Sequence, residues 1–140
     1  MDESLLDTDI MSEVLKAKNR QVLNLAQRYL DQHQRFAFSA ITLYEILRGL
    51  RASQASRALN TFLKLVDNSD VVPVSLAVLY RAADLWADAG EGGYPRNDAD
   101  LIIAATALES GRLLVTGNGP HFSWIPGLSL ADWRSIAPEA

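Results

Sequence analysis

The sequence contains no cysteine, and histidine is nearly absent. Disulfide bonds, thiolate metal sites and a cysteine nucleophile are therefore excluded from this chain of 140 residues. The two histidines are His33, expected at a polar helix end, and His121, expected in a loop. This distribution argues against a histidine-rich zinc site and against a histidine general base. A metal bound here would rely on oxygen ligands.

Long apolar runs are missing as well. No run approaches the roughly 20 residues that a membrane-spanning helix needs. The first residues, Met1-Asp2-Glu3-Ser4, are acidic where a signal peptide would be basic. We therefore expect a cytoplasmic protein with no membrane segment. With 49% hydrophobic residues, the chain suits a single domain over residues 1–140.

Charge is unevenly distributed along the chain. Nine basic residues and two acids lie between Lys16 and Lys64, which gives this segment a net charge of +7. Because the whole chain carries −4, the remainder carries −11. Solvated helix faces explain most basic segments of this kind, but a partner that is an anionic polymer fits the same pattern.

Short apolar strands alternate with helices in the sequence pattern. Strands are expected over residues 5–6, 36–38, 71–74, 113–115 and 129–130. Helices are expected over residues 9–17, 20–32, 40–50 and 98–108, with one more that opens at Ser53 or Ser56. A long helix from residue 76 through Trp86 is expected to fade into a loop over residues 90–95. Thr8 or Asp9 is expected to cap the first helix. This alternation predicts an α/β fold with a parallel sheet that helices cover on both faces.

Polar residues follow two of the predicted strands. Asp7 comes directly after the first strand, and Thr116, Gly117 and Asn118 follow the strand that ends at Val115. Ligands of parallel sheets collect beyond the carboxyl ends of the strands, so both groups should reach the same edge. A structural alternative exists for each, because Asp7 can cap the next helix and Asn118 can form a turn.

Two further carboxylates, Asp98 and Asp100, stand in front of the almost wholly apolar residues 101–108. They would occupy the first turn of a buried helix, at the positive end of its dipole, where clustered acids favour a cation. Asn97 as the N-cap, with Asp100 at the third helical position, would form a capping box that needs no catalysis. The sequence leaves open whether this helix start lies at the same edge as Asp7.

Glu45 lies within the helix expected over residues 40–50. On a helical wheel the apolar arc centres near Leu47 and Leu50, and Glu45 falls almost opposite. The wheel by itself therefore predicts a solvated glutamate.

Five short motifs lie in one order along most of the chain. They are residues 5–9 (LLDTD), residues 39–50 (SAITLYEILRGL), residues 98–107 (DADLIIAATA), residues 114–118 (LVTGN), and His121-Phe122 with residues 125–128 (IPGL). In this order they resemble the PIN-domain family, in the VapC-type toxin branch found in type II toxin–antitoxin systems. A single motif of this kind is weak evidence, whereas five in register are specific.

The resemblance implies a three-layer α/β/α fold with a central parallel sheet. It also implies a divalent-metal-dependent endoribonuclease that is the toxin of a toxin–antitoxin pair. The first acid of the family falls on Asp7, its helical glutamate on Glu45 and its third acid on Asp100. Asp98 matches an accessory acidic position. The fourth family position, aspartate in many members and asparagine in others, falls on Asn118, which leaves the number of metal ions open.

The implied reaction uses these groups. Phosphodiester hydrolysis builds negative charge that a divalent ion neutralises, and the ion lowers the pKa of a bound water. Carboxylates suit Mg²⁺, with Mn²⁺ as the alternative. We predict Asp7 and Asp100 as the principal metal ligands, and Glu45 and Asp98 as outer ligands or groups that orient the water. Asn118 is predicted to be a hydrogen-bond partner.

Substrate and partners follow from the same resemblance. Arg48 and Arg51 follow Glu45 on one helix and are the predicted RNA-binding residues, while Thr116 is predicted to hold its loop or a phosphate oxygen. Members of this branch usually act on structured RNA, often tRNA. They are inhibited by an antitoxin whose C-terminal segment covers a groove, and they are commonly homodimers. Four aromatic residues could supply contact surface but are expected in the core: Tyr29, Tyr44, Phe62 and Trp86.

Two other functions fit parts of the sequence. Asp7-Thr8-Asp9 also matches the nucleophile motif of haloacid-dehalogenase-like phosphatases. Against that family, Met11 stands where threonine or valine is expected, and no lysine follows residue 64. The second alternative is a non-catalytic PIN-like binding module whose metal site is too weak for catalysis.

Overall fold

The computed structural model describes residues 1–135, so the last residues of the predicted 1–140 domain lie outside the described residues. Within that range no helix has both the length and the apolar character to cross a membrane. The elements in chain order are β1 (Ser4–Leu6), α1 (Thr8–Lys16), α2 (Arg20–His33), β2 (Ala37–Ser39), α3 (Ala40–Ala52), α4 (Ser56–Asp67), β3 (Asp70–Val72), α5 (Leu76–Gly92), α6 (Asp98–Glu109), β4 (Leu113–Val115), α7 (Gly119–Phe122) and β5 (Leu130–Ala131).

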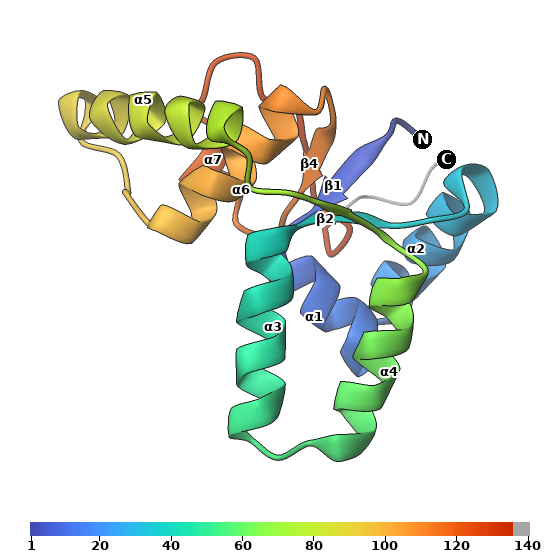
Figure 1. Ribbon diagram of the computed structural model, residues 1–140. Coiled ribbons are helices and arrows are strands. Elements are labelled where there is room, and N and C mark those ends of the chain that lie inside the picture. Colours follow the sequence, from blue (N-terminus) through green and yellow to red (C-terminus); the bar gives the residue numbers. More distant parts are fainter. Residues whose placement is uncertain (136–140) are drawn as a thin grey trace.

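The paired strands of the described chain are all parallel. β4 pairs with β1 on one side and with β5 on the other, while β2 pairs with β3. β1 and β2 contact each other without forming a hydrogen-bonded ladder. The predicted central sheet is therefore divided into a three-stranded and a two-stranded part that lie side by side (Figure 1). β3 is an edge strand, as Pro73 directly after it predicts.

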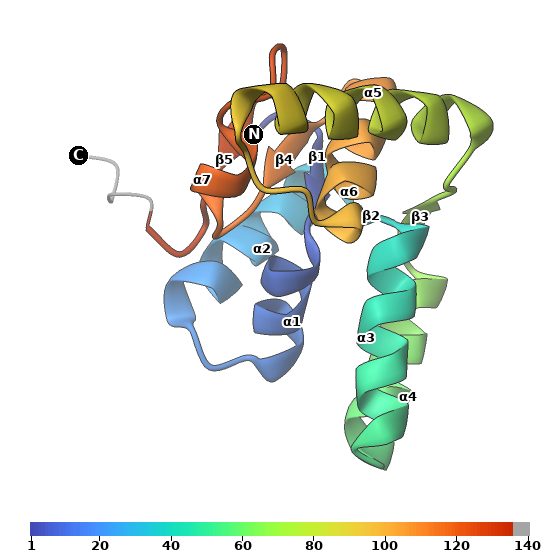
Figure 2. The same ribbon diagram turned by 90° about the vertical axis from the view of Figure 1, so that its left-hand side faces the viewer.

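Alternating side chains along the strands divide the core into two clusters. Leu5 and Leu114 pack with α5 and α6, whereas Leu6 and Val115 pack with α1 and α2. Successive residues of a strand point to opposite faces, so each short strand contributes to both clusters. Figure 2 shows the strands between α5 and α6 on one side and α1 and α2 on the other. The predicted α/β/α layering is confirmed.

The start of α1 and the end of α5 show where the structure departs from the predicted helices. The N-cap of α1 is Asp7 rather than Thr8 or Asp9, because Asp7 has an extended backbone at the end of β1 and its side chain accepts the N–H of Ile10. The helix expected to fade into a loop over residues 90–95 continues to Gly92. Ala89 near this end is completely buried, which anchors the end of the helix in the core.

The four aromatic residues expected in the core behave differently from one another. Tyr29 and Phe62 are buried, as predicted. Tyr44 and Trp86 are 53% and 46% exposed, so the prediction is wrong for them. An arginine lies over each exposed ring, with Arg48 Cζ 5.1 Å from the centroid of Tyr44 and Arg96 Cζ 3.8 Å from that of Trp86. Cation–π contacts cover part of both rings without burying them.

Helices α3 and α4 project from the body of the molecule as an antiparallel pair (Figures 1 and 2). Ile46 of α3 and Phe62 of α4 belong to the cluster that also holds Ile10 and Met11 of α1. Leu47 and Leu50 of α3 pack against the same cluster as partly buried side chains. The faces of α1, α3 and α4 beyond that cluster leave a groove, described below.

Candidate active site

Asp7 is the buried centre of the candidate site. Its N–H donates to the carbonyl of Val115 at 3.0 Å, which continues the pairing of β1 with β4. Its Oδ1 accepts the N–H of Ile10 at 2.9 Å, and the residue is only 4% exposed. The capping role considered as a structural alternative is therefore real. Capping and burial together fix this carboxylate at the carboxyl end of β1.

The surroundings of Asp7 disfavour its negative charge. The pKa of Asp7 is raised from 3.8 to about 6, chiefly by burial; the charges of Asp9 and Asp100 contribute to the increase, while hydrogen bonds from Thr116 and Ile10 act in the opposite direction. A buried carboxylate with a second acid nearby is stabilised by a bound cation. The electrostatics of Asp7 are therefore those of a cation-binding group.

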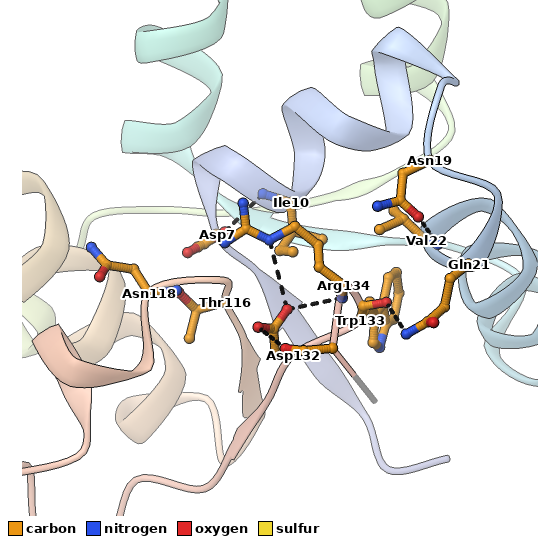
Figure 3. A network of polar contacts seen from close by, with 11 residues as sticks. Asp7, Ile10, Asn19, Gln21, Val22, Thr116, Asn118, Asp132, Trp133 and Arg134 are labelled. Carbon is orange, nitrogen blue, oxygen red and sulfur yellow. Dashed lines mark hydrogen bonds and ion pairs between the residues drawn. The ribbon is translucent and has the colours of Figure 1, made fainter. Parts of the chain in front are cut away.

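The loop after β4 lies beside Asp7. The Thr116 hydroxyl bonds to the Asp7 carboxylate, and Thr116 Oγ1 accepts the N–H of Asn118 at 3.0 Å. The N–H of Thr116 donates to the carbonyl of Ala131 on β5 at 2.9 Å. Figure 3 shows Thr116 and Asn118 on the side of the sheet edge that Asp7 also faces. The predicted meeting of the β1 and β4 ends is confirmed.

The start of α6 lies at the same edge, which the sequence left open. The charge of Asp100 reaches Asp7, and Asn97 caps α6 by accepting the N–H of Asp100 at 3.0 Å. The capping alternative for Asn97 is therefore real, and it positions Asp100 rather than competing with a role in the site. Asp98, in the same first turn, is exposed, and its side chain makes no hydrogen bond with residues 1–135.

His121 joins the site, although a loop position was expected. It lies in the short helix α7, and its Nδ1 is 3.1 Å from Asp100 Oδ2 and 2.7 Å from Asn118 Nδ2. One nitrogen can donate to Asp100 or accept from Asn118, so the tautomer decides which contact is a hydrogen bond. The spacing of three residues between Asn118 and His121 is the sequence signal for this contact, because it places both side chains on one face of a helical turn.

Glu45 is half-buried, and the helical wheel was wrong about its surroundings. Thr8 Oγ1 donates to Glu45 Oε1 at 2.7 Å and lies 3.1 Å from Thr42 Oγ1. Arg48 Nη2 lies 3.8 Å from Glu45 Oε2. The wheel considered α3 alone, whereas α1 packs against this face of α3 and brings Thr8 to the glutamate. Glu45 is thereby linked to Asp7 through the adjacent residue.

A groove of about 750 Å³ runs from Glu45 between α1, α3 and α4. Its lining is mainly apolar and includes the basic residues Lys16 and Arg57 as well as Glu45. The lining residues are Thr8, Ser12, Leu15, Lys16, Glu45, Ile46, Gly49, Leu50, Ala55, Ser56, Arg57, Ala58 and Thr61. Arg51 is outside the groove and lines a separate hollow with Gln54 and Leu59. Of the two arginines predicted to bind RNA, only Arg48 therefore lies beside an acid of the site.

The donor set fits a hard divalent cation with few protein ligands. Among residues 1–135, no group of three or more His, Cys, Asp or Glu side chains is arranged to hold a metal ion. Asp7 and Asp100 nevertheless lie close enough for the charge of one to raise the pKa of the other. Mg²⁺ is commonly held by one or two carboxylates, with water and substrate phosphates completing its coordination. A pair of carboxylates suits that mode of binding.

The sequence matches the PIN domain family over residues 4–125. The chain belongs to the PIN domain family. It is 28% identical over 130 residues to the tRNA(fMet)-specific endonuclease VapC of Shigella flexneri, covering 92% of this chain and 96% of that relative. It is 31% identical over 125 residues to VapC ribonuclease Y4jK of Sinorhizobium fredii, covering 84% and 89%.

A solved structure has the same fold as this PIN domain. The DNA-bound VapBC from Salmonella typhimurium matches it with a TM-score of 0.83 at 27% identity, over 95% of this chain and 99% of that one. The family and the α/β fold predicted from the five motifs are confirmed, and the chain is a VapC-type PIN domain.

Proposed function

We propose that this PIN domain is a divalent-metal-dependent endoribonuclease and the toxin of a toxin–antitoxin pair. The observation that carries the proposal is the position of Asp7, a buried carboxylate with a pKa of about 6 at the end of β1, beside Asp100 and hydrogen-bonded by Thr116. Its VapC relatives are named as ribonucleases and an endonuclease. The whole chain, residues 1–140, is proposed to act as one domain in the cytoplasm, where RNA is available.

Asp7 and Asp100 are the proposed principal ligands of Mg²⁺, with Mn²⁺ as the alternative and Glu45 as a third, outer ligand. When bound, the ion neutralises charge on the phosphate and lowers the pKa of a water molecule. The protein contributes position: Asp7 is fixed by Ile10, and Asp100 by the Asn97 cap and His121. Preorganised ligands lower the cost of assembling the reacting groups.

The remaining polar residues are assigned to water and substrate. Glu45, held by the Thr8 hydroxyl, orients the attacking water and accepts its proton, since the carboxylate is half-buried and fixed at Oε1. Asn118 donates a hydrogen bond at the edge, and Asp98 is an accessory acid on the exposed first turn of α6. Arg48 is the proposed contact for an RNA phosphate beside Glu45.

Thr116 and Arg51 have different places in the proposal. Thr116 holds its loop through its contacts with Asn118 and Asp7, and so keeps Asn118 at the edge. Arg51 is assigned a more distant RNA phosphate, because it lies six residues beyond Glu45, or about 9 Å along the helix axis. The proposed substrate is a structured RNA, and tRNA is the first to be tested, because one relative is named for tRNA(fMet).

The groove between α1, α3 and α4 is the proposed site for the antitoxin. The lining offers apolar contacts from Leu15, Ile46 and Leu50 and positive charge from Lys16 and Arg57. Glu45 connects the groove to the acidic edge, defined as the sheet edge that holds Asp7 and Asp100. A C-terminal antitoxin segment in the groove would block the site as it binds. The fold also matches that of a toxin–antitoxin complex from Klebsiella pneumoniae, with a TM-score of 0.70 at 25% identity, which supports a protein partner of this kind.

A homodimer is proposed as the state of the free toxin. The outer face of α5 carries exposed apolar side chains, with Leu76 and Tyr80 each 74% exposed and Leu79 45% exposed. Association through such a face would remove apolar surface from water. Light scattering on the purified chain measures the mass directly, and a monomeric mass would refute the dimer.

The function is tested with purified, partner-free protein and total RNA or tRNA in the presence of Mn²⁺. Cleavage is expected in the wild type and is expected to be absent with EDTA and in Asp7→Asn. Cleavage that survives both controls would indicate a contaminant, and no cleavage with any divalent ion would favour the binding module. A parallel assay with p-nitrophenyl phosphate tests the phosphatase alternative, which alone predicts phosphomonoester hydrolysis.

A further inference from the structure

Arg134 is a cation at the acidic edge, and the proposed function assigns it no role. It lies three residues beyond β5, whose parallel pairing with β4 brings the carboxyl end of β5 to the edge that holds Asp7. Figure 3 shows the Arg134 side chain reaching back from the end of β5 toward Thr116 and Asp7. The sequence pattern gave no reason to select this residue among the arginines.

The guanidinium of Arg134 lies directly against the loop that follows β4. A Cβ atom added to Gly117 would be 1.4 Å from Arg134 Nη2 and 1.9 Å from Arg134 Cζ. Such distances are impossible, so only glycine leaves room for the guanidinium in this position. Gly117 stands between Thr116 and Asn118, and Arg134 is therefore placed at the loop that borders Asp7.

The backbone that carries Arg134 is fixed, whereas its charged end is weakly held. Trp133 is buried, and its carbonyl accepts a hydrogen bond from Gln21 Nε2 at 2.9 Å. Asp132 Oδ1 accepts the backbone N–H of Arg134 at 2.9 Å. The same oxygen is 3.7 Å from Arg134 Nε, which is an ion-pair distance but too long for a hydrogen bond. Within residues 1–135 the guanidinium has no other ionic partner, and its side chain is 35% exposed.

We propose that Arg134 binds a phosphate of the RNA strand at the acidic edge, and this inference rests on the proposed ribonuclease function. A guanidinium presents N–H groups in a planar fork that matches two phosphate oxygens. The nearby charges of Asp7, Asp9 and Asp100 repel RNA, and one cation at this edge reduces that repulsion. Gly117 makes the binding position possible, because any larger residue would displace the guanidinium from the loop.

The test compares wild type with Arg134→Gln, Gly117→Ala and the surface control Arg81→Gln, whose arginine pairs with Glu109 on the helices α5 and α6. Gly117 does not have a positive φ, so alanine is compatible with its backbone. Binding of a short fluorescent RNA is measured by anisotropy in EDTA at several salt concentrations, and the RNA is checked afterwards for integrity. KM and kcat are measured with Mn²⁺.

Arg134→Gln is expected to raise the Kd for RNA about 10-fold and to reduce the slope of log K against log salt by about 1, as for one lost phosphate contact. Gly117→Ala should give a similar loss, and the two changes together should cost no more than one alone. KM should rise more than kcat falls, and Arg81→Gln should match wild type. Melting temperatures report whether each variant folds.

Two results would overturn the inference. One is an unchanged salt slope and KM in folded Arg134→Gln, which would leave the ribonuclease proposal standing with Arg134 as a structural residue. The other is weaker antitoxin binding with unchanged RNA binding, which would assign the guanidinium to the protein partner. If neither the wild type nor any variant cleaves RNA, the proposed ribonuclease function fails. The slope of log K for RNA against log salt, measured in EDTA, still decides whether Arg134 contacts a phosphate.

Discussion

The acidic edge and the α1–α3–α4 groove are adjoining surfaces with opposite chemistry. At the edge, elements distant in sequence bring together carboxylates whose positions are fixed by specific hydrogen bonds. The groove has mainly apolar walls and a volume of about 750 Å³. They meet at Thr8 and Glu45, where α1 contacts α3. Because the two surfaces differ in this way, we expect mutations to affect the proposed catalysis and the proposed inhibition separately, except at Glu45, which belongs to both.

The largest effect is expected from Asp7→Asn at the acidic edge. Asparagine keeps the hydrogen-bond acceptor for Ile10 and therefore the helix cap, but it removes the charge that holds the cation. RNA cleavage should fall on the order of 10³-fold, while antitoxin binding in the groove should change little. Initial rates with a defined RNA and calorimetry with the antitoxin measure the two effects.

The matched control for that variant is Asp9→Asn, two residues along and exposed on α1. It removes the same charge from the same helix turn without touching the buried position. A loss of cleavage in Asp9→Asn as large as in Asp7→Asn would mean that net charge, rather than the buried carboxylate, governs the rate.

The next largest effect concerns the stability of the metal-free protein. The pKa of Asp7 is about 6 in the folded state against 3.8 ordinarily, so the folded protein binds this proton more tightly than the unfolded chain does. The free energy of unfolding should therefore decrease as pH rises from about 4 to 6, and the full cost, about 3 kcal/mol, should be present above pH 6. Lowering the pH from 7 to 5 in EDTA should thus recover part of this stability.

Other groups titrate in the same pH range, so Asp7→Asn supplies the comparison. Denaturant unfolding of both proteins between pH 5 and 7.5 should show the variant more stable at pH 7.5, with the difference shrinking toward pH 5. Identical pH profiles for the two proteins would contradict the raised pKa.

A smaller effect is expected from filling the groove. A side chain added at Gly49 would meet no neighbouring atom within 4 Å, so Gly49→Phe should project into the open space of the groove. Antitoxin binding should weaken about 10-fold to 100-fold, whereas cleavage by the free toxin should stay within about twofold of wild type. The Kd comes from titration of the labelled antitoxin.

Gly49→Ala is the control for that change. It adds helix propensity, about 1 kcal/mol of stability, without filling the groove. Normal inhibition of Gly49→Phe by the antitoxin would place the binding site elsewhere, and equal losses in both variants would point to an effect on α3 itself.

The smallest effect is expected where the two surfaces meet. Thr8→Val keeps the shape of the side chain but removes the hydroxyl that donates to Glu45 Oε1 at 2.7 Å. The kcat should fall about 10-fold, which corresponds to about 1.4 kcal/mol and lies near the lower end of the values for a lost hydrogen bond to a charged group. Thr8→Ser retains the donor and should restore most of the rate, so an equally slow Thr8→Ser would argue against the hydroxyl.

Residues placed by one short element were predictable from the sequence. Asp7 and Thr116 follow buried strands, and the rule for parallel sheets was enough to bring them to one edge. Glu45 was misjudged because a helical wheel carries no information on α1, which supplies Thr8.

The positions of His121 and Arg134 depend on how α7 and the end of β5 turn back toward the edge, and such turns are set by contacts distant in sequence. Tyr44 and Trp86 were misplaced because periodicity does not anticipate cation–π contacts at the surface.

Asp7 and Asp100 are proposed to hold a divalent ion together, and thermal unfolding with and without millimolar Mn²⁺ measures that binding. Binding to the folded state alone raises the melting temperature by mass action. We expect Mn²⁺ to raise the melting temperature of wild type and of Asp9→Asn, and not that of Asp7→Asn or Asp100→Asn. No metal-dependent shift in the wild type, or an undiminished shift in both site variants, would contradict it.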